Sequence, residues 1–127
     1  KIDDESAAGL IRQRVATIVK ADPGLAELPE EARKSALRGD LFIKDGVFTD
    51  ALAEYRKALK IAPFNAQLYF NAALICDQLK EYRQAINLMT VYLQLNPDAP
   101  NVRAAKDGIY RWEFQLEEQL RTRGERK

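Results

Sequence analysis

The residue types that most often carry catalysis are scarce in this chain. None of its 127 residues is a histidine, which removes the commonest general base near neutral pH. Serine occurs only at Ser6 and Ser35, both on predicted helices and with no base available to activate a hydroxyl. The single cysteine, Cys76, lacks the electropositive setting that a nucleophilic thiolate needs. Nucleophilic and acid–base catalysis are therefore not expected.

The carboxylates and glycines do not suggest a different chemistry. Carboxylate pairs such as Glu30–Glu31 and Glu117–Glu118 fall at helix ends or on solvated faces. The glycines are scattered singly, so no phosphate-binding loop is present. The turn residues Asp45, Gly46 and Asp98 are isolated, whereas an oxygen cage for a metal needs clustered acids. The sequence predicts no enzyme, no metal site and no cofactor.

Charge and hydropathy also limit the kinds of partner. Twenty basic and 19 acidic residues give a net charge of +1, so no overall field attracts nucleic acid. No apolar run approaches the roughly 20 residues that span a bilayer, and membrane insertion is not expected. One cysteine does not assign a compartment, and the localisation stays open. The chain begins with Lys1 rather than Met, which is typical of a fragment or a processed product.

The elements that position any functional side chain follow from a pattern that occurs twice, 34 residues apart. Small, aromatic and proline positions of the first copy recur in the second. The pairs are Gly39 and Ala73, Phe42 and Cys76, Ala51 and Ala85, Tyr55 and Met89, Ala58 and Tyr92, and Pro63 and Pro97. A fixed period of this length is typical of a repeat architecture.

The pattern resembles the tetratricopeptide repeat (TPR) family over roughly half of the chain. The second copy carries the family's typical residues Tyr69, Ala72, Ala73, Tyr82, Ala85 and Pro97, and the first matches at Gly39, Phe42, Gly46, Phe48, Ala51, Tyr55, Ala58 and Pro63. The first copy departs at Ser35 and Arg38, so we expect its first helix to pack more loosely. The resemblance implies an all-α, right-handed α–α superhelix. Less specifically, 97–100 and 109–113 resemble segments of bacterial TPR proteins, which are often exported.

Turn and cap residues divide the chain into a single domain with four parts. These are an N-terminal helix and linker (1–30), a first repeat (31–65), a second repeat (66–99) and a capping helix (100–127). Helices are expected at 31–44, at 49–61 with Thr49 as N-cap, at 66–79, at 82–95 and at 100–122. Ala51 and Ala85 are placed where the two helices of each repeat cross closely. The opening helix is either a lid on the first repeat or a partner-binding arm.

The resemblance implies that the first helix of each repeat lines a concave groove that holds a partner's peptide or helix. Carried over position by position, the groove contains Arg33, Ala36, Asp40, Ile43, Lys44, Gln67, Phe70, Asn71, Leu74, Asp77, Gln78, Ala104, Gly108 and Arg111. Phe70 and Leu74 are expected to form an apolar floor. The amide of Asn71 can pair with both a donor and an acceptor of an extended backbone.

One known type of TPR groove does not fit. Domains that clamp the C-terminal carboxylate of chaperones need five polar residues, and this chain offers Ala36, Asp40, Asn71, Asn101 and Ala105 at those positions. Only Asn71 matches, and Asp40 would repel the carboxylate.

On the capping helix, Val102, Ala105, Ile109, Trp112, Leu116 and Leu120 form one apolar stripe. Tyr110 and Phe114 lie on a second side, which is either an exposed contact surface or partly buried against the second repeat. The function predicted from the sequence is non-catalytic: an interaction module or scaffold that binds a protein partner. The alternative is self-association into a homodimer through Tyr110, Trp112 and Phe114.

Overall fold

The computed structural model describes residues 28–124, and in that range it is built from α-helices without a strand. The helices are α4 (Glu30–Lys44), α5 (Phe48–Ile61), α6 (Ala66–Gln78), α7 (Tyr82–Leu95) and α8 (Val102–Gly124). The all-α repeat fold predicted from the sequence is confirmed, and α8 shows the largest shift in bounds. The predicted opening helix lies outside the described residues. None of the helices in the described range is long and apolar enough to cross a membrane.

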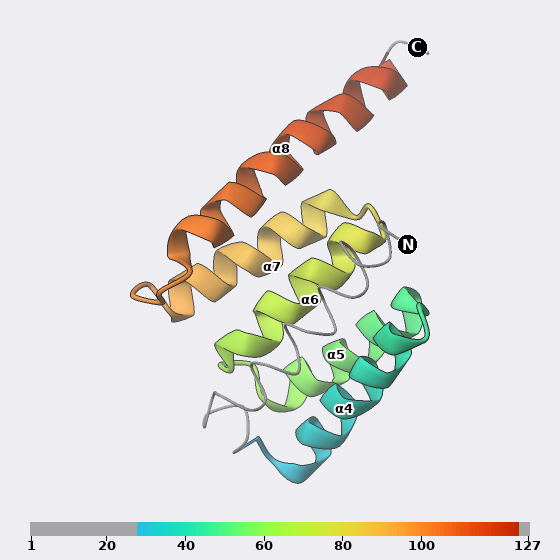
Figure 1. Cartoon of the computed structure of the whole chain (residues 1–127), viewed down its shortest axis with the longest axis vertical. Helices are drawn as coiled ribbons and strands as arrows, with labels where there is room; N and C mark the ends of the chain where they lie inside the picture. The colour runs from blue at the N-terminus through green and yellow to red at the C-terminus, as the bar shows by residue number, and fades with distance from the viewer. Residues whose placement is uncertain (1–27, 125–127) are drawn as a thin grey trace.

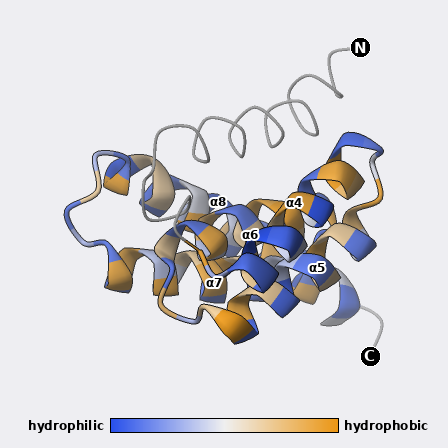
Figure 2. Cartoon of the chain, turned by 90° about the horizontal axis from the view of Figure 1, so that it is seen from below, coloured by the Kyte–Doolittle hydropathy of each residue, from blue (hydrophilic) through white to orange (hydrophobic). Residues whose placement is uncertain are grey.

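The helices stack as two hairpins followed by a single long helix (Figure 1). The closest packing is within each hairpin, between α4 and α5 and between α6 and α7; α5 then contacts α6, and α7 contacts α8. Seen from below, α4 and α6 lie on one side of the stack and α5 and α7 on the other, and α8 crosses behind them (Figure 2). This alternation places the first helix of each repeat on the same side of the stack.

The first hairpin closes where a glycine of α4 meets a tyrosine of α5. A Cβ atom added at Gly39 would lie 2.6 Å from Cδ1 of Tyr55 and 3.3 Å from the carbonyl oxygen of Ala51. Ala51 and Ala85 are both fully buried, as expected for small residues at helix crossings. The absence of a side chain at Gly39 therefore lets the Tyr55 ring lie against the α4 backbone.

The same turn connects the helices of each hairpin. Gly46 has φ +77° and Lys80, its equivalent 34 residues later, has φ +60°. Only glycine adopts this left-handed region without a steric cost. In the second hairpin the turn contacts α8, because Nε2 of Gln119 donates to the Lys80 carbonyl oxygen at 3.3 Å.

Two local predictions are wrong. Thr49 does not cap α5, because the helix begins at Phe48 and its N-cap is Val47, without a side-chain hydrogen bond. The departures at Ser35 and Arg38 do not loosen the first hairpin, whose two helices pack as closely as those of the second. Arg38 instead reaches across to α5, where its Nε lies 3.2 Å from Oε2 of Glu54.

The first half of the capping helix α8 packs against the second hairpin. Ala105, Gly108 and Trp112 are its buried residues, and Trp112 is only 1% exposed. The side chains of Ala105 and Trp112 join Phe70, Met89 and Tyr92 in the core of the second hairpin. After Trp112 no residue of α8 is buried, although Leu116 still packs against this core. The last turns of α8 extend past the beginning of α7 (Figure 1).

Candidate partner-binding groove

The residues predicted to line the groove come from α4, α6 and α8, but they differ in exposure. Exposed residues are Arg33, Lys44, Ala104 and Arg111. Half-buried residues are Asp40, Gln67, Leu74, Asp77 and Gln78. Buried residues are Ala36, Ile43, Phe70, Asn71 and Gly108. We call the exposed and half-buried residues together the groove face.

The predicted apolar floor is divided between the core and the surface. Phe70 is 4% exposed, and its ring lies against Tyr92 of α7 with the centroids 5.0 Å apart and the planes tilted by 56°. That arrangement is typical of a core aromatic pair. Leu74, one turn further along α6, keeps part of its side chain accessible. Of the two, Leu74 is therefore the one that offers apolar surface to a partner.

Asn71 lies beneath the groove face, and its side-chain amide makes no well-formed hydrogen bond. Its side chain is 0% exposed, and neither Nδ2 nor Oδ1 has a partner at hydrogen-bonding distance and angle. Burial and then the Asp40 carboxylate raise the pKa of Tyr55, and hydrogen bonding to Asn71 partly opposes that rise. The Asn71 amide is therefore close to the Tyr55 hydroxyl, although the contact lacks the geometry of a well-formed hydrogen bond. Buried polar groups without partners are uncommon in native structures, and each calls for a reason.

Asp77 joins α6 to the capping helix. Burial raises the pKa of its carboxyl group, while a hydrogen bond from the Trp112 indole and the positive charge of Arg111 act against that rise. The Tyr82 hydroxyl also has a raised pKa, first through burial and then through the Asp77 charge. The sequence placed Asp77 in the groove but gave no signal of its contact with Trp112, since the two residues belong to different repeats.

Two other chemically active side chains, those of Cys76 and Tyr92, are buried. Cys76 is fully buried, and burial raises the pKa of its thiol to about 11, which keeps it protonated near neutral pH. Within residues 28–124, no three acidic, histidine or cysteine side chains come together as a metal site would require. A hydrogen bond of 2.7 Å from the Tyr92 hydroxyl to Oδ1 of Asn101 ties α7 to the loop before α8.

The three residues predicted for self-association separate into two environments. Tyr110 and Phe114 are 60% and 61% exposed, so the structure favours the exposed alternative for this side of α8. Trp112 faces the opposite way, is 1% exposed and packs in the core. It supports α8 from within and offers no surface to a second copy.

Stacked helix pairs whose first helices share one layer define a helical-repeat solenoid, a class of protein interaction scaffold. The sequence model of the family described as "Tetratricopeptide repeat" matches residues 42–108, more than half of the chain, and the protein belongs to this family. No curated protein sequence matches it. Repeats of this family generally mediate protein–protein interaction and are generally non-catalytic.

Proposed function

We propose that the chain binds an extended segment of a partner protein along the groove face. The family membership supports a protein partner in general. The groove face adds chemistry for a polypeptide, because it combines partly accessible apolar surface at Leu74 with the amides of Gln67 and Gln78 on the same helix. Amides that both donate and accept suit a peptide backbone, which presents both groups at every residue.

The observation that carries the proposal is the Asn71 amide. Next to the groove face, neither its Nδ2 nor its Oδ1 makes a well-formed hydrogen bond, although the Tyr55 hydroxyl lies close to the amide. A bound backbone would supply one N–H and one C=O group and remove the cost of leaving the amide unsatisfied, about 1–3 kcal/mol. Asn71 is fully buried, so this requires a small displacement of the side chains above it.

The charges of the groove face indicate which segments fit best. Its exposed charged residues, Arg33, Lys44 and Arg111, are all basic, whereas the acidic residues Asp40 and Asp77 are half-buried. Arg33 already has a partner in Glu30, 3.1 Å away. Lys44 makes no ion pair with a described residue. We therefore expect an apolar side chain in the partner to lie near Leu74, with acidic residues beside it.

The test is selection of ligands from a random peptide library, followed by affinity measurements on single variants. Leu74→Ala and Arg111→Ala should each weaken binding of the selected peptides by about 10-fold, the effect of one interface contact worth 1.4 kcal/mol. The matched controls are Ala53→Ser and Arg83→Ala, exposed positions on α5 and α7. Equal affinities for the parent and both groove variants, or a loss confined to the controls, would remove the proposal.

A further inference from the structure

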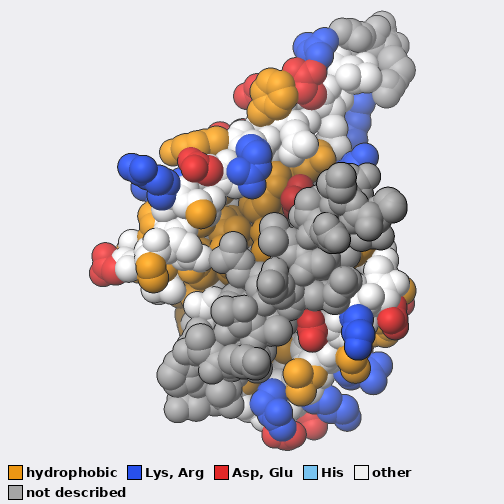
Figure 3. Space-filling model, viewed as in Figure 1, with side chains coloured by type: hydrophobic (Ala, Val, Ile, Leu, Met, Phe, Trp, Pro, Cys, Tyr) orange, Lys and Arg blue, Asp and Glu red, His pale blue; other side chains and the backbone are white. Residues whose placement is uncertain are grey.

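The side of α8 that faces away from the core is a surface without a covering helix in the described chain. Ala105, Gly108 and Trp112 pack inward, and at 100° per residue Tyr110 and Phe114 point the opposite way. The rings are 60% and 61% exposed, two large aromatic residues one turn apart. We call Arg103, Lys106, Asp107, Tyr110, Glu113, Phe114 and Glu117 the outer face of α8. Figure 3 shows hydrophobic and charged side chains close together along this helix.

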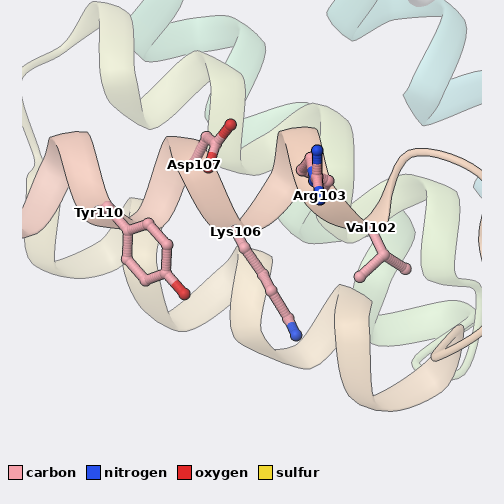
Figure 4. Close-up of a pocket in the computed structure, with 5 residues that line it drawn as sticks. All are labelled: Val102, Arg103, Lys106, Asp107 and Tyr110. Atoms are coloured by element: carbon pink, nitrogen blue, oxygen red, sulfur yellow. The ribbon is translucent and has the colours of Figure 1, made fainter.

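A depression lies in the first half of the outer face. It is framed by Arg103, Lys106, Asp107 and Tyr110, with Val102 at its edge, and has a volume of ≈ 280 Å³. Val102, Lys106 and Tyr110 project to one side of the helix and Asp107 to the other (Figure 4). Small-molecule sites usually measure about 300–1,000 Å³, so this open depression is small for a ligand.

The spacing of the framing residues suggests a different occupant. Positions 103, 106, 107 and 110 are i, i+3, i+4 and i+7, the four residues that form the hole for one side chain of a facing helix. Phe114, one turn beyond Tyr110 on the same face, is a large exposed side chain without such a hole in the described chain. The outer face therefore presents both a knob and a hole.

The charges of the outer face are arranged so that it complements itself. Its first half holds Arg103 and Lys106 with one acid, Asp107, and its second half holds Glu113 and Glu117, so the two halves carry net charges of opposite sign. All are exposed, and none of them forms an ion pair with another described residue. An antiparallel copy of the helix brings the basic half against the acidic half, whereas a parallel copy brings like charges together.

We propose that two copies of this chain associate through the outer faces of α8 in an antiparallel, two-fold symmetric pair. Phe114 of each copy enters the hole between Lys106 and Asp107 of the other. This register places Tyr110 beside its own equivalent at the two-fold axis. It also sets Arg103 opposite Glu117 of the second copy, and Lys106 opposite Glu113 of the second copy.

The size of the surface sets the expected strength. A stable interface usually involves about 20–30 residues a side, and one face of a single helix offers far fewer. We therefore expect a dissociation constant of about 10–100 μM rather than an obligate dimer. The groove face lies on other positions of α4, α6 and α8, so dimerisation and partner binding can fail independently.

The first experiment is sedimentation equilibrium of the 127-residue chain from about 1 to 500 μM, a range that brackets the expected dissociation constant. Phe114→Ala should raise the constant at least 30-fold, roughly the effect of losing an aromatic hot spot. The matched control is Phe64→Ala, which removes a ring that is 83% exposed in the loop between α5 and α6. Circular dichroism establishes that each variant is folded.

Two further sets of variants test the register. Arg103→Glu and Glu117→Arg should each weaken the dimer about 10-fold, and the double variant should restore it, because the charges are exchanged across the interface. Tyr110→Cys should form an intermolecular disulfide on mild oxidation, since the proposed axis brings the two positions together. Arg121→Cys, three turns away on the same side, should not.

A chain that stays monomeric over the whole range would overturn the proposal. So would a dimer that Phe114→Ala leaves intact, or a double charge variant that is no tighter than the single variants. Efficient cross-linking at Arg121→Cys but not at Tyr110→Cys would contradict the antiparallel register.

Discussion

The two hairpins close the same helix crossing with different divisions of volume. In the first, Gly39 leaves room for the large Tyr55 ring. In the second, the equivalent positions hold Ala73 and the slimmer Met89, and all four residues are buried. What is preserved over the 34-residue period is the filled space, not the residue types, as expected for interiors packed at crystal-like density. The two repeats are therefore better compared by the pairs of residues at each helix crossing than by single positions.

The hairpins differ more on the groove side. Asn71 and Asp77 of the second occupy the positions of Leu37 and Ile43 in the first. Ile43 is fully buried, whereas Asp77 is half-buried and hydrogen-bonded to Trp112. At these two positions the second hairpin therefore has a polar residue where the first has an apolar one.

The crossing pairs give the largest predicted effect. Gly39→Ala places a Cβ atom 2.6 Å from the buried Tyr55 ring and should lower the free energy of unfolding by about 1–3 kcal/mol, the usual cost of overpacking. Adding Tyr55→Met copies the second hairpin and should recover most of that loss. Urea unfolding of the single and double variants measures both. A single variant as stable as the parent would show that the crossing has spare room.

The turns give the next largest effect. Gly46→Lys should lower the free energy of unfolding by about 1–2 kcal/mol, since a side chain is disfavoured in the left-handed region. Lys80→Gly should raise the free energy of unfolding by a smaller amount, because glycine also increases the entropy of the unfolded chain. Thermal unfolding would show the two opposite shifts, with Lys80→Ala close to the parent as control. Two shifts of the same sign would contradict the equivalence of the turns.

The ion pair of the first hairpin should matter less. Glu54 is 5% exposed and contacts Arg38 and Lys57, whereas its equivalent in the second hairpin is Leu88. Glu54→Leu should change the free energy of unfolding by less than about 1 kcal/mol, because apolar packing offsets the lost pair. Chemical denaturation in low and high salt measures this; the parent should weaken with salt more than the variant. A large loss in the variant would mean that the pair is essential to the hairpin.

The smallest effect is a pH dependence at Asp77. Its folded pKa is raised by burial, so the folded state holds the proton more tightly than the unfolded chain, and stability is lost as pH rises through the raised pKa. The amide of Asp77→Asn can still accept a hydrogen bond from the Trp112 indole. The stability of this variant relative to the parent should increase as pH rises from mildly acidic to neutral. Unfolding curves at several pH values would show this. A difference that does not vary with pH would mean that Asp77 titrates normally.

Helix bounds and repeat register could be predicted because they depend on local signals: apolar periodicity, turn residues and a small residue at each crossing. Contacts between distant residues could not. Phe70 was expected in the groove floor, but its burial depends on Tyr92, and the burial of Trp112 depends on Asp77 of another repeat. Arg38 was predicted to loosen its helix because its partner Glu54 lies on the next one.

The most direct test of the proposed function is an NMR titration of the isotope-labelled chain with a peptide selected for binding. Recognition at the groove face predicts the largest changes at the side-chain amide of Asn71 and at the backbone amides of Leu74 and Gln78. Resonances from exposed positions of α5 and α7 should move little. Unchanged Asn71 signals at saturation, with shifts confined to α5 and α7, would contradict it.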